Sequence, residues 1–237
     1  CAVAVTDHLE MVDYEDYVGT LVKSWRDSGE AVPAYAGRLR IARGIELGEP
    51  LADLKRTEAI LDAYDFDFVL GSQHKLNSLD RETNIDYYFY DYTGKDVGLV
   101  MDEYFDAVLE LVNWGRFHAL AHLTYPFRYI PEEKRPADFS RWQDRIDAIL
   151  RQLAVKGLAL EINTSGLRQP GGTTHPPLSL VRRFRQLGGE FITIGADAHR
   201  PEDVGTGLEQ AAALAREAGF THQAVFFGGK MELLPLE

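Results

Sequence analysis

Residues 191–199 read Phe-Ile-Thr-Ile-Gly-Ala-Asp-Ala-His, an apolar run that closes on an aspartate and a histidine. The run predicts a buried strand of a parallel sheet. One residue separates Asp197 from His199, so on an extended strand end both side chains point the same way. A carboxylate and an imidazole together suit Zn²⁺, Mn²⁺ or Fe²⁺. Taken alone, the pair has a plainer interpretation, in which Asp197 caps the next helix and His199 lies in a surface loop.

Four further apolar runs end in residues that bind metals well. His8 follows Ala-Val-Ala-Val-Thr-Asp, Glu46 follows Ile-Ala-Arg-Gly-Ile, His74 follows Phe-Val-Leu-Gly-Ser-Gln, and His122 follows His-Ala-Leu-Ala. A lone histidine is more often a core or loop residue, whereas Glu46 is costly to bury unless it is paired or metal-bound. Six such residues on five strand ends favour a shared metal site, because a β/α barrel builds its active site at the carboxyl ends of its strands.

Strand and helix patterns alternate along the chain. Strands are predicted at about 2–6, 38–46, 66–73, 117–122, 157–163 and 191–197, and helices at about 13–28, 50–63, 97–114, 139–156, 176–188 and 206–219. Gly29, Gly188 and Gly219 suit the left-handed residue that follows many helices. This order predicts a single α/β domain over residues 1–237, with helices covering a parallel sheet. Polar residues follow all six predicted strands and are not confined to one switch point in the strand order. This distribution favours a closed barrel over an open doubly wound sheet.

The composition limits the classes of partner. The 237 residues carry 25 Lys and Arg against 37 Asp and Glu, a net charge of −12. No nucleic acid is expected as a partner, because binding it needs a basic face, but a small phosphorylated substrate is compatible because bound metal ions can reverse the local potential. No apolar run approaches the ~18 residues of a membrane span. The single cysteine, Cys1, suits a reducing cytosol, so a cytoplasmic location is expected and the oligomeric state is left open.

The amino terminus is unusual. The chain has no initiator methionine and opens inside an apolar strand, from Cys1 to Val5. We therefore expect a truncated amino terminus, with an earlier strand and helix missing.

The ordered motifs resemble the PHP superfamily, named for polymerase and histidinol phosphatase domains, and most closely its monofunctional histidinol-phosphate phosphatases. The matching segments are Ala-Val-Thr-Asp-His (4–8), Arg-Gly-Ile-Glu (43–46), Phe-Val-Leu-Gly-Ser-Gln-His (68–74), Ala-His-Leu-Thr-Tyr-Pro-Phe-Arg-Tyr (121–129), Leu-Glu-Ile-Asn-Thr-Ser-Gly-Leu-Arg (160–168) and Ile-Gly-Ala-Asp-Ala-His-Arg-Pro-Glu-Asp-Val-Gly (194–205). The resemblance implies a distorted (β/α)7 barrel that holds up to three Zn, Mn or Fe ions. The family's opening His-x-His motif has no counterpart here, which fits a missing first strand.

The resemblance also distributes the six candidate ligands over three metal sites. It implies Asp197 in the first site, His8 and His199 in the second, and His74 with His122 in the third, with Glu46 bridging two ions.

The implied reaction is hydrolysis of a phosphate monoester, L-histidinol phosphate, to the alcohol and inorganic phosphate. Arg168 and Arg200 are candidates to bind the phosphate, and Asn163 to orient the substrate. Asp197 or His199 would pass a proton to the leaving alkoxide. Two other hypotheses stay open: a PHP phosphoesterase acting on nucleotides or oligonucleotide ends, and a non-catalytic barrel retained for partner binding.

Overall fold

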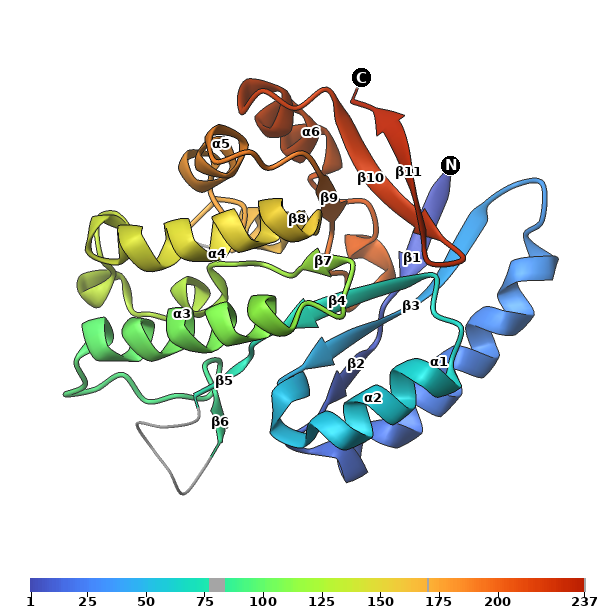
Figure 1. The fold of residues 1–237 in the computed structure, drawn as a ribbon, viewed down its shortest axis with the longest axis horizontal. Coiled ribbons are helices and arrows are strands. Elements are labelled where there is room, and N and C mark those ends of the chain that lie inside the picture. Colours follow the sequence, from blue (N-terminus) through green and yellow to red (C-terminus); the bar gives the residue numbers. More distant parts are fainter. Residues whose placement is uncertain (77–83, 170, 237) are drawn as a thin grey trace.

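A curled parallel sheet forms the centre of the computed structural model, which describes residues 1–76, 84–169 and 171–236 (Figure 1). The strand order is β1-β3-β4-β7-β8-β9, and β2 pairs with β3 beyond the end of β1. The strands of this sheet are β1 (Ala2–Val5), β2 (His8–Glu10), β3 (Arg40–Gly48), β4 (Phe68–Ser72), β7 (Ala119–Leu120), β8 (Ala159–Asn163) and β9 (Ile192–Gly195). Because every neighbouring pair is parallel, their carboxyl ends share one edge.

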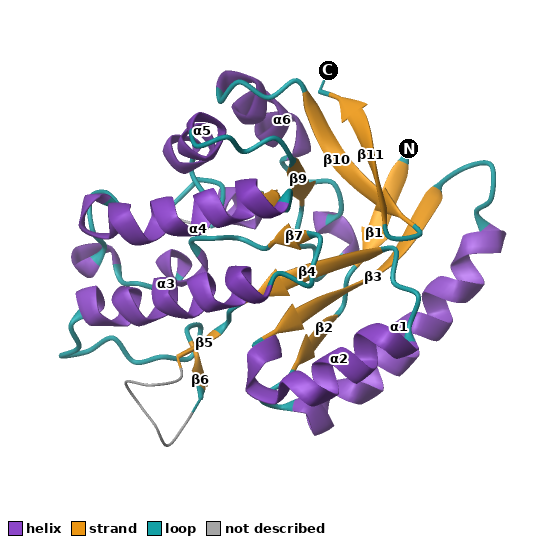
Figure 2. Ribbon diagram, in the orientation of Figure 1, coloured by secondary structure: helices purple, strands orange, loops and turns teal. Residues whose placement is uncertain are grey.

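Helices connect the strands and cover the outer face of the sheet, as Figure 2 shows. They are α1 (Tyr14–Ala34), α2 (Leu54–Ala63), α3 (Val97–Trp114), α4 (Gln143–Lys156), α5 (Leu178–Gln186) and α6 (Leu208–Glu217). The predicted range 97–114 is confirmed for α3, because its ends carry strong signals: Asp96 accepts a hydrogen bond from the Gly98 N–H, and Gly115 adopts a φ of 72°.

The prediction that α1 ends before Gly29 is wrong, because the helix continues to Ala34. The guanidinium of Arg43 lies 3.3 Å from the centre of the Trp25 ring and donates to the Trp25 carbonyl oxygen. A Cβ at Gly29 would lie 3.3 Å from Arg43 Nη2. The glycine therefore makes room for a side chain of β3 rather than terminating the helix. Gly188 and Gly219 follow α5 and α6 with φ of 95° and 98°, as expected.

An antiparallel hairpin packs against the amino-terminal end of the sheet. It consists of β10 (His222–Phe227) and β11 (Lys230–Pro235). The Phe226 ring lies 5.2 Å from the ring of Phe68, the first residue of β4, and 4.7 Å from that of His118. His118 Nδ1 accepts the Val69 N–H at this apolar end, so His118 lies away from the strand ends that carry the candidate ligands.

β1 and β9 are the two edges of the sheet, and no hydrogen-bonded pair joins them within the described part of the chain. The predicted parallel sheet with covering helices is confirmed, in the form of a curled half-barrel. The predicted closure into a barrel is not formed among the described residues, because β1 and β9 do not pair. A short ribbon, β5 (Lys75–Leu76) with β6 (Ile85–Asp86), follows β4 at the edge that carries the candidate ligands. Among the described helices, none combines the length and apolar character needed to cross a bilayer.

Candidate metal centre

The candidate ligands lie along the carboxyl-terminal edge of the sheet. His8 opens β2 and stands in register with Glu46 of β3. His74, His122 and Asp197 each follow the end of their strand by two residues, on β4, β7 and β9. Parallel pairing therefore gathers side chains that are far apart in the sequence, as predicted.

Three of these side chains lie within hydrogen-bonding distance of one another. His74 Nε2 lies 3.2 Å from His122 Nε2, and Glu46 Oε1 lies 3.0 Å from each of these nitrogens. All three residues are buried. Ligand atoms around a tetrahedral Zn²⁺ at bonds of about 2.0–2.1 Å lie roughly 3.3–3.4 Å apart, so the triangle fits one face of such a site. Two imidazole nitrogens and one carboxylate oxygen are also ligands that Zn²⁺ accepts.

Glu10, at the end of β2, contacts two of the histidines and was missed by the sequence prediction. Its Oε1 lies 2.9 Å from His8 Nδ1 and 3.0 Å from His74 Nδ1. The opposite nitrogen of His8, Nε2, lies 3.8 Å from Glu46 Oε2. A signal existed in the sequence: Glu10 follows His8 by two residues, on the same face of the strand, and a buried carboxylate needs partners.

Asp197 lies apart from the triangle and is held by three donors. Its Oδ2 accepts hydrogen bonds from Arg128 Nη2 at 2.9 Å, Ser165 Oγ at 3.1 Å and Asn163 Nδ2 at 3.2 Å. The two helical elements that follow Asp197 are capped by Arg200 and Gly207, so the plainer interpretation of Asp197 as the cap of the next helix is wrong.

Arg128 is a second residue that sequence reasoning missed. It lies on the 3₁₀ turn Tyr125–Arg128 after β7 with only 6% of its side chain exposed, and it also donates to Asn163 Oδ1 at 3.2 Å. It lies inside a segment already singled out, but the turn that aims it at Asp197 has no sequence signature specific enough to show this.

The remaining predicted residues have distinct surroundings. Arg168 Nη2 donates to the carbonyl oxygens of Ala196 and Asp197 at 2.9 and 3.1 Å, while its buried Nη1 has no hydrogen-bond partner among the described residues. His199 exposes 67% of its side chain and lies with its ring 5.6 Å from that of His8. Arg200 is exposed beside it. Asn163 is buried and spans Glu161, Asp197 and Arg128 through hydrogen bonds.

Buried carboxylates crowd this edge of the sheet: Glu10, Glu46, Glu49 and Glu161, with Asp197 nearly buried beside them. Burial and the charge of Glu46 raise the pKa of Glu161 to about 8, although Glu161 Oε2 accepts the His122 N–H. Burial disfavours the ionised form of Asp197, but Arg128 outweighs it and lowers the pKa of Asp197 to about 2. Burial also opposes ionisation of Glu46, yet the facing histidines lower its pKa. Carboxylate oxygens buried together with histidine nitrogens are the ligand atoms expected at a site that binds a metal cation.

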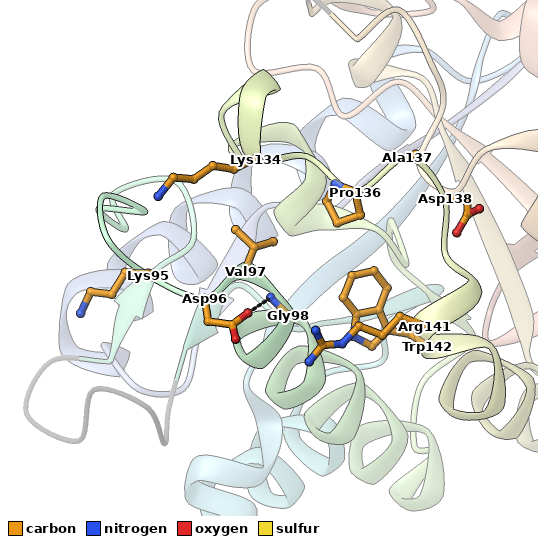
Figure 3. Close-up of a pocket in the computed structure, with 10 residues that line it drawn as sticks. All are labelled: Lys95, Asp96, Val97, Gly98, Lys134, Pro136, Ala137, Asp138, Arg141 and Trp142. Carbon is orange, nitrogen blue, oxygen red and sulfur yellow. Dashed lines mark hydrogen bonds between the residues drawn. The ribbon is translucent and has the colours of Figure 1, made fainter.

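A pocket of about 490 Å³ lies at the start of α3 (Figure 3). Its three cationic side chains already have partners: Lys134 Nζ donates to the Tyr92 carbonyl oxygen, Arg141 Nη2 donates to Asp102, and Lys95 Nζ lies 5.6 Å from the centre of the Tyr90 ring. The pocket shares no lining residue with the Glu46, His74 and His122 triangle. We therefore place the candidate site at the strand ends and not in this pocket.

Comparison with proteins of known sequence gives consistent relatives. The histidinol-phosphatase of Lactococcus lactis subsp. lactis (strain IL1403) is 29% identical over 218 residues, which cover 92% of this chain and 79% of that protein. The probable histidinol-phosphatase of Thermotoga maritima is 32% identical over 187 residues, which cover 76% of this chain and 78% of that protein.

A solved structure and a family model agree with these relatives. The crystal structure of histidinol phosphate phosphatase from Lactococcus lactis subsp. lactis Il1403, complexed with zinc, L-histidinol and phosphate, matches 98% of this chain and 87% of its own. The TM-score of that match is 0.76, at 25% sequence identity. The family model of the PHP domain matches residues 1–165. With the strand-end histidines and carboxylates in this arrangement, the chain belongs to the PHP domain family.

Proposed function

We propose that this chain hydrolyses L-histidinol phosphate to L-histidinol and inorganic phosphate. The observation that carries the proposal is the buried triangle of Glu46, His74 and His122, in a chain whose relatives are named histidinol-phosphatases. Divalent ions bound at such a site would offset the charge of the phosphoryl group and lower the pKa of water. Phosphate monoesters hydrolyse extremely slowly without a catalyst, so electrostatic help of this kind is required.

Up to three divalent ions form the proposed cofactor. Glu46, His74 and His122 hold one ion, and His8 with His199 contributes to a second, since their rings lie 5.6 Å apart. Asp197 contributes to the remaining site. Zinc is the first candidate because the Lactococcus lactis structure contains it, and manganese or iron suit the same nitrogen and oxygen ligands.

The chain's own side chains then bind phosphate and move protons. Arg168 offers its buried Nη1 to a phosphate oxygen while its Nη2 fixes the carbonyl groups beside Asp197. Arg200 adds a second, exposed guanidinium. Asn163 orients Asp197 and the substrate. His199 Nδ1 lies 3.3 Å from Asp197 Oδ1, so this pair is placed to hold a proton for the leaving alkoxide.

A carboxylate among aromatic rings lies next to the triangle and suits the cationic end of histidinol. The Tyr125 ring lies 4.8 Å from His74 and 4.9 Å from His122, and its hydroxyl donates to Asp86 Oδ1 at 3.0 Å. The Tyr88 backbone N–H donates to the same oxygen. Aromatic faces beside a carboxylate attract an ammonium or imidazolium group, which a nucleotide base does not supply.

The proposed biological setting follows the same reasoning. We propose residues 1–237 as one PHP-type domain of a cytoplasmic enzyme whose partner is a small phosphorylated substrate. Among the described residues no hydrogen-bonded pair joins β1 to β9, so a strand with the family's His-x-His motif would fit between them and complete the distorted barrel. Its histidines would add ligands to the first site.

The test compares phosphate release from L-histidinol phosphate and from adenosine monophosphate by zinc- or manganese-loaded protein. We expect a higher kcat/KM for histidinol phosphate, lost in His122→Ala and kept in His222→Ala, whose histidine is exposed on β10. Asp86→Asn should raise the KM for histidinol phosphate but not for the nucleotide. Preference for the nucleotide would favour the nucleotide phosphoesterase hypothesis. Metal-loaded protein that releases no phosphate from either substrate would favour a non-catalytic barrel.

A further inference from the structure

We propose that Glu10 is a positioning residue that sets the ring tautomer of two metal-binding histidines, His8 and His74, so that both turn Nε2 toward the metal centre. The inference rests on the metal-dependent function proposed above. It concerns a residue of β2 that binds neither metal nor substrate and acts through its two neighbours.

The hydrogen bonds of Glu10 determine which ring nitrogens carry a proton. Its Oε1 lies 2.9 Å from His8 Nδ1 and 3.0 Å from His74 Nδ1, and Oε2 lies 3.2 Å from His74 Nδ1. An ionised carboxylate only accepts hydrogen bonds, so both Nδ1 atoms must donate. A neutral imidazole then has its one free lone pair on Nε2.

Both Nε2 atoms face the same carboxylate, that of Glu46. The distance to the nearer Glu46 oxygen is 3.0 Å from His74 and 3.8 Å from His8. The buried Glu10 carboxylate therefore aims two lone pairs, from two different segments of the chain, at the Glu46 carboxylate: that of His74 at Oε1 and that of His8 at Oε2. Metal-bound histidines generally have such a partner on their second nitrogen, and it fixes both tautomer and ring orientation.

The alternative is that Glu10 is itself a ligand, since His8, Glu10 and His74 also lie close enough to hold an ion. A neutral ring has a single lone pair. If His74 gave Nδ1 to that ion, its Nε2 would carry a hydrogen and could not serve with Glu46 and His122. The 3.0 and 3.2 Å distances from His74 Nε2 to those two residues therefore favour the positioning role for Glu10.

Gly48 provides the space that Glu10 needs. The two residues stand in register on β2 and β3, and a Cβ at position 48 would overlap the Glu10 carboxylate. Gly48→Ala should therefore displace this carboxylate without removing it from the chain.

The experiment measures binding of Co²⁺ alone to metal-free protein, by competition with a chromophoric chelator. The variants are Glu10→Gln, Glu10→Leu and Gly48→Ala. The matched control is Asp147→Asn, a carboxylate on α4 that pairs with Arg183 away from the site. We expect Glu10→Leu to weaken Co²⁺ binding about 10- to 100-fold at unchanged stoichiometry. Glu10→Gln keeps an accepting oxygen and should recover most of the affinity, and Gly48→Ala should weaken binding in the same sense as Glu10→Leu.

Nitrogen-15 NMR of the zinc-loaded protein gives a readout that a merely structural role would not change. We expect Nδ1–H signals for His8 and His74 in the unsubstituted protein and in Glu10→Gln, and their loss in Glu10→Leu. If Glu10→Leu does not fold, Gly48→Ala serves in its place.

Two results would overturn the inference. A stoichiometry that falls by one ion in Glu10→Gln would make Glu10 a ligand. Unchanged affinity and tautomers in folded Glu10→Leu or Gly48→Ala would leave Glu10 a packing residue. Neither readout uses phosphate release, so a protein that binds Co²⁺ as expected but does not hydrolyse histidinol phosphate refutes the proposed function and not this inference.

Discussion

Replacing Arg128 with methionine removes the cation that faces Asp197 and keeps a long apolar side chain in its place. The two residues expose only 6% and 11% of their side chains, and Nη2 lies 2.9 Å from Oδ2. The fall of the Asp197 pKa to about 2 corresponds to roughly 2–3 kcal/mol in favour of the ionised form. Breaking a buried ion pair typically costs about 3–5 kcal/mol. We therefore expect Arg128→Met to lower the free energy of unfolding by about 2–5 kcal/mol.

Urea unfolding of metal-free protein, followed by circular dichroism at several pH values, measures this loss. In the unsubstituted protein, the stabilisation from ionised Asp197 is complete above its unfolded pKa of ~4 and disappears as the pH falls through about 2. In Arg128→Met, protonation relieves the unpaired carboxylate. The difference between the two proteins should therefore be largest at neutral pH and shrink in acid.

A double-mutant cycle completes this experiment. Adding Asp197→Asn to Arg128→Met should cost much less than the sum of the single changes, because the partners are in direct contact. Arg40→Met, which breaks an exposed pair with Glu232, is the control and should change stability little. The reasoning is refuted if Arg128→Met costs less than about 1 kcal/mol, the range of exposed pairs, or if the two substitutions simply add.

Further substitutions and the addition of zinc test other parts of the structure. Trp142→Ala should cost about 3–5 kcal/mol in urea unfolding, because the side chain is buried against aromatic neighbours; a loss below 1 kcal/mol would contradict this packing. Gly44→Ala should lower the free energy of unfolding because the new Cβ would lie 2.6 Å from the Phe68 carbonyl oxygen. Gly19→Ala in α1, where a Cβ would meet nothing within 4 Å, should instead raise the free energy of unfolding by about 0.5–1 kcal/mol. Zinc at 100 times its dissociation constant should stabilise the protein by about 2.7 kcal/mol, seen as a higher Tm that a chelator reverses; the same rise in His122→Ala would place the ion elsewhere.

The fold was predictable because the strands of a covered parallel sheet are buried on both faces and appear as local apolar runs. The run before Asp197 and the run before His74 both form strands near their predicted bounds. The length of α1 was not predictable in the same way. Gly29 lies inside it because of Arg43, a residue of another element, and only the folded chain brings the two together.

The candidate site, like the fold, could be predicted from the sequence only in part. Sequence reasoning identified Glu46, His74 and His122 because parallel strands bring their ends to one edge, and the triangle forms there; their role as ligands stays a prediction. It did not find Glu10 or Arg128, because their importance depends on which atom of a neighbouring side chain they face. A pattern gives the position of a residue, whereas hydrogen-bond partners depend on rotamers and turns that are set by tertiary packing.

Backbone conformation gives an independent reason to regard these strand ends as functional. Glu49, His122 and Asp197 follow β3, β7 and β9, and they adopt positive φ values of 46°, 24° and 48°. Such values cost a residue with a Cβ about 1–2 kcal/mol, which glycine would avoid. Glycine has no side chain to accept the His74 N–H as Glu49 does, to join the triangle as His122 does, or to pair with Arg128 as Asp197 does. Because the chain keeps these side chains where the backbone favours glycine, their chemistry outweighs local stability, as it does in active sites that hold strained residues in place.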